Sequence, residues 1–525
     1  MAADVTERQN MNSEKKTASM NRAKLYQLVL FPFNNGATNV YYVLTMNYIA
    51  YHANGVLGLA LMFATTMVTV MRVFDAVTDP IIGMLIDKTS GKFGKFRPYI
   101  VLGNVIMAVS AILLYFGTRL IPDSMVWLKY VGFVAMYMLY VIGYTFQTAC
   151  TRSGQTVITN DPNQRPLFTI FNTIASLVGM GLVQVVATVV GGQVGYGSEA
   201  FFNFLIPLAI VLSAGLTILA VIGIWEKDRP EFYGIGTEKK EKVKVSEYVD
   251  IVKKNKELRM LMLAGGSTKL AFAIATNASV ACMLYASMMG DYNGLYLPIY
   301  IICYVASVPF FLLSVRTAQK KGQRAALALY TRIALFCYIG VLALLLIWNP
   351  ENAATMLSLK HINIYTIGFV LCYAIGYGAY YSTADMPIPM VADCSDYETY
   401  RSGNYVPGIM GTLFSLVDKL VSSLGSTIVG AAVMMIGIKT LPDTNTPYMP
   451  GMKWVVIVLF CILPMLAWIL TQYAMHHYSL SGDRMKEIQS VNAVRKQAVN
   501  DGMKLEDAME RYQILADVPE EFQQK

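Results

Sequence analysis

The chain has 525 residues, of which 55% are hydrophobic and only 14% are charged, and its formal net charge is +8. Its mean hydropathy is +0.45. Because a soluble domain usually carries about 25% charged residues, this composition excludes a soluble globular protein and indicates a membrane protein. The seven cysteines are scattered without paired spacing, which argues against a disulfide framework and against a metal site.

Apolar runs recur along the chain after a polar beginning. Residues 1–24 are mixed in charge and have no apolar core, so no cleaved signal peptide is expected. Each later run is long enough to cross ~30 Å of hydrocarbon as a helix. We predict an all-α membrane protein with twelve transmembrane helices, at residues 26–50, 56–86, 97–120, 126–152, 166–193, 202–225, 260–289, 293–315, 325–348, 362–391, 405–437 and 453–475.

Lysines and arginines gather in alternate links between these runs, for example at Lys92 and Arg97 and at Lys239 and Lys240. Basic links lie on the cytoplasmic side of a membrane, so both termini are expected there, in a cell inner membrane. This asymmetry explains the net charge without nucleic acid.

A long charged link divides the twelve spans into two sets of six, as in an internally repeated transporter. We expect five parts. They are an N-terminal cytoplasmic segment at 1–25, a six-helix bundle at 26–225, a central link at 226–259, a second bundle at 260–477, and a helical tail at 478–525. The tail either docks on the inner face as a solvated helix or has a regulatory role.

The second span carries Arg72, Asp75 and Asp79 at positions i, i+3 and i+7, which share one helix face. Each charge in the middle of a span costs roughly 2.5–3.5 kcal/mol on insertion scales, so these three must face a bundle interior or a watery cavity. The two carboxylates suit a small cation or a proton. The alternative for Arg72 and Asp75 is an ion pair that only joins helices.

Polar residues in other spans suggest further contacts with a ligand. The eleventh span contains Lys419, a natural counter-charge for Asp75 or Asp79. Asp385 stands beside two prolines and is a candidate gate or binding residue. The first and fourth spans contain "FPFNNGATNVYY" and "GYTFQTACTRSGQT", whose amides, hydroxyls and aromatic rings are of the kind that sugars require.

Two motifs resemble a known family. The segment "RVFDAVTDPIIGMLIDKTSGKFGKFRP" is similar to the second-span signature of the glycoside–pentoside–hexuronide:cation symporters, the melibiose permease-like branch of the major facilitator superfamily. The segment "MVADCSDYETY" resembles the family's motif after the tenth span, and "VDKLVSS" places Lys419 where the family carries a lysine. The resemblance covers about 26–480 and implies a major facilitator-type fold that works by alternating access.

The resemblance also implies a cation site. Asp75 and Asp79 match the family's two cation-site aspartates, and Thr145 matches the hydroxyl that completes the site. Arg72 and Lys419 match charged neighbours that couple the cation to the substrate. Thr78 stands where melibiose permease has an asparagine, so Na⁺, Li⁺ and H⁺ all remain open as coupling ions.

The sugar-binding positions depart further from the family pattern. The acidic and aromatic residues that bind galactosides in that branch correspond here to Asn34, Thr148 and Arg152, and an arginine corresponds to Asn172. Together with Lys419, these are the expected substrate residues. The added positive charge favours an anionic sugar such as a uronide, because the fork of Arg152 can hold a carboxylate. The alternative is that Arg152 only faces the cytoplasmic entrance.

The expected function is therefore symport of a glycoside, pentoside or hexuronide with Na⁺ or H⁺. No cofactor is expected beyond the coupling ion, no metal beyond Na⁺ at Asp75 and Asp79, and no partner beyond the substrate and the bilayer. We expect a monomer and no enzyme, since the sequence has no glycine-rich phosphate loop. Two alternatives remain: a symporter of another solute such as a lysolipid, and a non-transporting sensor.

Overall fold

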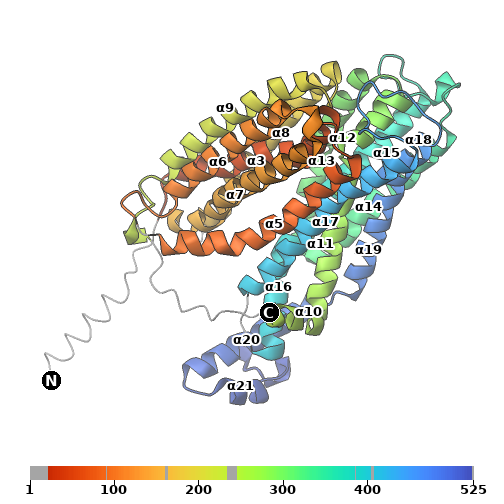
Figure 1. Ribbon diagram of the computed structural model, residues 1–525. Helices are drawn as coiled ribbons and strands as arrows, with labels where there is room; N and C mark the ends of the chain where they lie inside the picture. Colours follow the sequence, from red (N-terminus) through yellow and green to blue (C-terminus); the bar gives the residue numbers. More distant parts are fainter. Residues whose placement is uncertain are drawn as a thin grey trace, which may run out of the picture. The chain divides into compact units, whose positions relative to one another are not determined.

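The computed structural model describes residues 22–89, 91–159, 164–232, 245–384, 386–403 and 407–522. These residues form helices joined by short connections, and none of them belongs to a named strand. By its internal contacts the chain divides into two compact units. The first unit comprises residues 1–59, 73–190 and 198–239, and the second comprises residues 60–72, 191–197 and 240–525. Figure 1 shows the helices of each unit.

The first unit contains the N-terminal helices. Helix α6 packs on α7 and α9, and α3 also packs on α7 and α9. Helix α5 begins in the second unit and continues into the first. The helices are α2 (Leu25–Leu30), α3 (Phe33–Val43), η1 (Leu44–Tyr48), α4 (Ile49–Tyr51), η2 (His52–Val56), α5 (Leu61–Lys88), α6 (Arg97–Tyr115), η3 (Gly117–Leu120), η4 (Asp123–Met125), α7 (Val126–Ile158), α8 (Gln164–Val194), α9 (Glu199–Ile224) and η5 (Pro230–Phe232).

The second unit contains the C-terminal helices. Helix α11 packs on α17 and α19, and α15 packs on α13 and α14. The helices are α10 (Val245–Lys254), α11 (Lys256–Ala275), α12 (Ala278–Ala281), η6 (Cys282–Met288), α13 (Tyr292–Lys321), α14 (Gln323–Ile347), η7 (Ala353–Thr355), α15 (Ile364–Tyr381), α16 (Pro387–Ser402), α17 (Pro407–Met435), α18 (Met452–Val456), η8 (Ile457–Ile462), α19 (Leu463–His477), α20 (Asp483–Asn500), α21 (Leu505–Arg511), η9 (Leu515–Asp517) and η10 (Glu520–Phe522).

Eleven helices within the described ranges are long and apolar enough to cross a membrane. The remaining predicted span, the first, is divided into short pieces. Pro32 separates α2 from α3 because it has no backbone N–H to donate, and the π-helical turns η1 and η2 interrupt the rest. With this divided span included, the predicted all-α fold of twelve transmembrane helices is confirmed.

Close backbone contact fixes the polar part of α3. A Cβ atom added to Gly179 of α8 would lie 2.1 Å from the carbonyl oxygen of Gly36, and one added to Gly36 would lie 2.7 Å from the carbonyl oxygen of Ala175. Only glycine permits this approach of two helices, a common device in membrane bundles. This close contact fixes the position of the polar residues that flank Gly36 along the axis of α8.

The basic link before α6 is held by a buried carboxylate of its own unit. Asp228 is fully buried and accepts hydrogen bonds from the backbone N–H groups of Lys95, Phe96 and Arg97 at 2.8, 3.0 and 2.8 Å. The Arg97 side chain adds an ion pair at 3.4 Å. Asp228 thus caps the first turn of α6, where the helix dipole favours negative charge.

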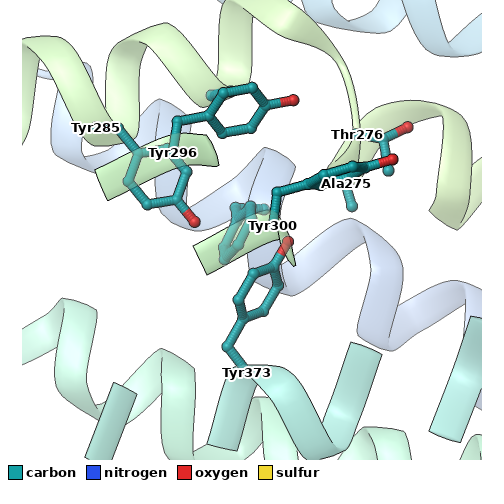
Figure 2. A pocket seen from close by; sticks show the side chains of 8 residues that line it. Ala275, Thr276, Tyr285, Tyr296, Tyr300 and Tyr373 are labelled. Carbon is teal, nitrogen blue, oxygen red and sulfur yellow. The ribbon is translucent and has the colours of Figure 1, made fainter. Parts of the chain in front are cut away.

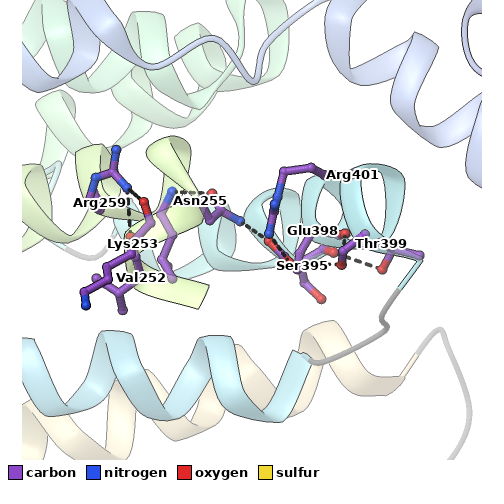
Figure 3. Close-up of polar contacts among 10 residues, drawn as sticks. Val252, Lys253, Asn255, Arg259, Ser395, Glu398, Thr399 and Arg401 are labelled. Atoms are coloured by element: carbon purple, nitrogen blue, oxygen red, sulfur yellow. Dashed lines mark hydrogen bonds and ion pairs between the residues drawn. The ribbon is translucent and has the colours of Figure 1, made fainter. Parts of the chain in front are cut away.

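Helix α16, which carries the "MVADCSDYETY" motif, is held from two sides within the second unit. Glu398 accepts a hydrogen bond from Asn255 at 2.9 Å, and its other carboxylate oxygen pairs with Arg401 at 2.6 Å (Figure 3). The tail helix α20 packs on α16, and Arg495 donates to the Tyr400 carbonyl oxygen at 2.7 Å. The tail predicted from residue 478 is helical and docks on this motif.

Candidate functional site

A buried carboxylate and two hydroxyls meet where α5 lies near α7 in the first unit. Asp75 is 1% exposed, and its Oδ1 accepts a hydrogen bond from Thr145 Oγ1 at 2.8 Å. Thr78 Oγ1 lies 3.4 Å from Thr145 Oγ1. The predicted cluster of Asp75, Thr78 and Thr145 is therefore assembled in the folded chain, and its donor atoms are all oxygens, which suit a hard cation.

The Thr145 hydroxyl has more acceptors than protons. Its single O–H proton can point to Asp75 Oδ1 at 2.8 Å or to the Val141 carbonyl oxygen at 2.9 Å. When the proton points to Val141, the lone pairs of Thr145 Oγ1 are available to a cation beside Asp75. The hydroxyl can thus either donate to the carboxylate or help to ligate an ion, without any movement of the helices.

Asp79 has a partner that its own helix does not provide. Arg152 Nη1 of α7 lies 3.6 Å from Asp79 Oδ2, and the two side chains are 59% and 25% exposed. The sequence did not indicate this pair, and Arg152 was expected either to bind the substrate or to face the cytoplasmic entrance. The structure pairs Arg152 and Asp79 across two helices, and the role of Arg152 toward the substrate stays a prediction. A partly exposed pair of this kind is weak, so an arriving cation or anion could separate it.

Asn34 is enclosed in a hydrogen-bond network between three helices. Its amide nitrogen donates to the Gln147 carbonyl oxygen at 2.9 Å and to Thr151 Oγ1 at 2.7 Å. Its Oδ1 accepts from Gln147 Nε2 at 2.9 Å, and Gln147 also donates to Thr217 Oγ1 at 2.8 Å. Since Asn34 is fully buried and both its amide protons are used, it positions α3 against α7 and α9 in this state.

The half-buried polar groups nearby are better placed for a ligand. Asn172 accepts through its backbone carbonyl oxygen from Asn35 Nδ2 at 3.4 Å, while its buried side-chain Oδ1 has no hydrogen-bond partner among the described residues. Asn39 donates to Asn35 Oδ1 at 3.0 Å. Thr148 donates only to carbonyl oxygens of its own helix, so its lone pairs stay available. Asn172, Thr148 and Asn35 are all half-buried, and the role of Asn172 and Thr148 toward the substrate stays a prediction.

The two predicted coupling cations belong to the second unit. Within that unit α5 runs beside α17, since Thr69 donates to the Ser423 carbonyl oxygen at 3.0 Å and Thr427 donates to that of Thr65 at 3.4 Å. The contacts run antiparallel, so Arg72 and Lys419 follow about one turn further along this seam. Arg72 is 8% exposed and Lys419 is partly buried. Asp385, the candidate gate, lies outside the described residues.

The sequence did not indicate that Gln147 links Asn34 to Thr217 in one hydrogen-bond network. Thr217 of α9 carried no signal, because a lone threonine in an apolar run is ordinary. Among the described residues, no group of three or more His, Cys, Asp and Glu side chains could hold a metal ion. The candidate site of the first unit therefore combines one buried carboxylate, one ion-paired carboxylate, hydroxyls and amides.

The chain is similar over most of its length to bacterial symporters. It is 23% identical to YagG of Escherichia coli, a candidate glycoside/cation symporter, with 85% of this chain and 89% of that protein covered. It is also 23% identical to the inner membrane symporter YicJ of the same organism, with 87% and 92% covered.

Solved structures agree with the fold. A mutant form of the nucleoside transporter NupG superposes with a TM-score of 0.53 at 11% identity, and the match covers 85% of this chain and 98% of that one.

The family model for the MFS/sugar transport proteins matches residues 31–482. The chain therefore belongs to the MFS/sugar transport family, as a multi-pass inner membrane protein of the glycoside–pentoside–hexuronide symporter type.

Proposed function

We propose that this protein carries a sugar across the membrane together with a cation that binds at Asp75. The observation that supports this most directly is the 2.8 Å hydrogen bond from Thr145 to the buried Asp75 carboxylate, with Thr78 beside it. A carboxylate taken out of water is costly unless its charge is balanced. Na⁺ or H⁺ would balance it, and Asp79 would supply a second carboxylate when its contact with Arg152 opens.

Coupling follows from this charge. A carrier that must close around its ligands closes more readily when the Asp75 charge is neutralised, and the sugar and the cation then raise each other's affinity. We propose Arg72, which lies one turn before Asp75 on the same helix, and Lys419 as coupling residues, as the resemblance to the symporter family implies. This role would make the empty carrier and the fully loaded carrier the two states that can reorient.

The proposed substrate is a glycoside, pentoside or hexuronide. Relatives of this chain include proteins named lactose permease in Leuconostoc lactis and raffinose carrier protein in Pediococcus pentosaceus. Asn172, Thr148 and Asn35 offer amide and hydroxyl groups of the kind that bind sugar hydroxyls, with Asn34 holding α3 in place. Neither the lysolipid alternative nor the sensor alternative is favoured by any relative named here.

The proposed orientation places both termini in the cytoplasm, and the proposed carrier acts as a monomer. The positive-inside rule supports the orientation through basic links such as that at Lys92 and Arg97.

The test is transport by Asp75→Asn in proteoliposomes. We expect the variant to lose uphill accumulation of labelled sugar driven by a Na⁺ or H⁺ gradient, and to keep exchange of labelled for unlabelled sugar, because a neutral amide mimics the neutralised carboxylate. Asp123→Asn is the matched control, since Asp123 is 97% exposed and is the first residue of the candidate span Asp123–Gly154. Uphill uptake that persists in Asp75→Asn would refute the assignment.

A further inference from the structure

Four tyrosines line one face of α13 in the second unit. Tyr292, Tyr296, Tyr300 and Tyr304 follow one another at intervals of four residues, and neighbouring ring centroids lie 5.1, 6.0 and 5.2 Å apart. Twelve residues of helix rise about 18 Å. The row therefore runs more than halfway through ~30 Å of hydrocarbon. Interfacial tyrosines form a belt at one depth, so this row is not an interfacial belt.

A second row on α15 meets the first. Tyr373, Tyr377 and Tyr381 also follow at intervals of four, with centroids 6.0 and 5.5 Å apart. The Tyr304 and Tyr381 rings lie 5.5 Å apart, and their hydroxyls are 3.0 Å apart. We call these two rows the tyrosine wall. Its rings come from two helices that are far apart in the sequence.

The tyrosine wall borders a small pocket inside the second unit. Tyr296, Tyr300 and Tyr373 line it together with Tyr285, Thr276 and Phe460, and Figure 2 shows the phenol rings grouped around this space. Among the described residues that line the pocket, none has a carboxylate, an ammonium or a guanidinium group. The pocket therefore offers ring faces and hydroxyl groups but no fixed charge.

Several side chains of the tyrosine wall are more exposed than ordinary core residues. Tyr296, Tyr300, Tyr304 and Tyr381 are only partly buried. Aliphatic side chains occupy a different face of α13, where Ile301 is 51% exposed and Val305 is 66% exposed. Among the described residues, the phenol oxygen of Tyr377, which is 1% exposed, has no hydrogen-bond partner. The tyrosine wall therefore contains an unused hydrogen-bonding group beside its partly exposed rings.

From these features we infer that the tyrosine wall binds the ring of an uncharged sugar, which makes the substrate a neutral glycoside. The inference rests on the proposed function. The C–H face of a pyranose is slightly positive and packs on the negative face of a phenol ring, while sugar hydroxyls exchange hydrogen bonds with phenol oxygens. A uronide carboxylate would be desolvated here without a cationic partner in the pocket, at considerable cost.

The first test measures binding of lactose, raffinose and methyl glucuronide to the purified full chain by isothermal titration calorimetry. For the wild type we expect at least one neutral sugar to bind ~tenfold more tightly than the glucuronide. Tyr300→Leu should weaken that binding by ~tenfold, and Tyr300→Phe, which keeps the ring, by much less. Tyr473→Leu is the matched control, because Tyr473 is 54% exposed and its ring contacts His477 instead.

A second test avoids any variant that fails to fold. Nitration of tyrosines in the wild-type protein, mapped by mass spectrometry, should slow at Tyr296 and Tyr300 when the neutral sugar is added, and stay unchanged at Tyr473. Wild-type affinity in Tyr300→Leu, or unaltered nitration of Tyr296 and Tyr300 under saturating sugar, would overturn the inference.

The two proposals fail in different ways. If the wild type accumulates a sugar uphill while Tyr300→Leu binds it normally, the tyrosine wall is not the sugar surface and symport stands. If the wild type prefers the glucuronide, the neutral class is wrong and symport again stands. If the wild type neither binds nor accumulates any of the sugars, both proposals are overturned.

Discussion

The two units solve different recognition problems with different chemistry. In the first unit, polar side chains form hydrogen bonds and an ion pair with defined directions. Thr145 donates to Asp75, and Gln147 donates to both Asn34 and Thr217. Arg152 forms an ion pair with Asp79. In the second, the tyrosine wall presents ring faces, and the lining of its pocket is uncharged. Directional groups suit a cation and single sugar hydroxyls, whereas ring faces suit the flat C–H face of a sugar.

This difference also separates the consequences of mutation. Removing one hydrogen-bonding atom from the first unit leaves a buried group without a partner, so the expected loss of stability or affinity is large. Removing one hydroxyl from the tyrosine wall leaves the ring in place, so the expected loss of sugar affinity is small. The following changes test that contrast in order of decreasing expected effect.

Thr145→Val should have the largest effect, on cation affinity. The substitution keeps the shape but removes the hydroxyl that contacts Asp75, so we expect cation affinity to fall at least ~tenfold, as a lost bond to a charged group implies. Cation affinity is measured from the dependence of sugar binding on cation concentration. Thr188→Val is the control, because Thr188 is also buried in the first unit and its hydroxyl donates to the Gln184 carbonyl oxygen of its own helix. Equal cation affinity in the two variants would show that Thr145 is no ligand.

Gln147→Leu should have an intermediate effect, on stability. It leaves Asn34 Oδ1 and Thr217 Oγ1 without their buried donor, at a cost of about 1–3 kcal/mol for the network. Thermal unfolding in detergent should therefore begin at a lower temperature than in the wild type. Gln193→Leu, at an exposed position of α8, should unfold like the wild type. An unchanged midpoint for Gln147→Leu would mean that the network adds nothing to stability.

Asp393→Asn should have the smallest effect, on the pH dependence of stability. Burial, with help from Asp396, raises the pKa of Asp393 from 3.8 to about 6. The folded state therefore holds this proton more tightly than the unfolded state, and stability falls as pH rises from about 4 to 6. In Asp393→Asn this part of the fall should be missing from melting curves taken across that range. A profile that matches the wild type would rule out Asp393 as its source.

The sequence alone determined the membrane fold and the residues proposed for the cation site. Spans can be predicted locally, because a helix in lipid satisfies its own backbone and needs only a sufficient apolar length. Arg72, Asp75 and Asp79 stand out for the same reason, since charges inside a span are costly. The row of tyrosines on α13 is likewise visible as a four-residue spacing in the printed sequence.

Only the tertiary structure decided which of these residues meet. The sequence suggested Arg152 and Asn34 for the substrate, and it did not reveal that Arg152 lies beside Asp79 or that Asn34 joins two helices. The fold also joins the tyrosine rows of α13 and α15 into one surface. Helical periodicity tells which side chains share a face, but the partner of that face depends on how helices cross. That crossing is set by small residues in close contact, such as Gly36 and Gly179, far apart along the chain.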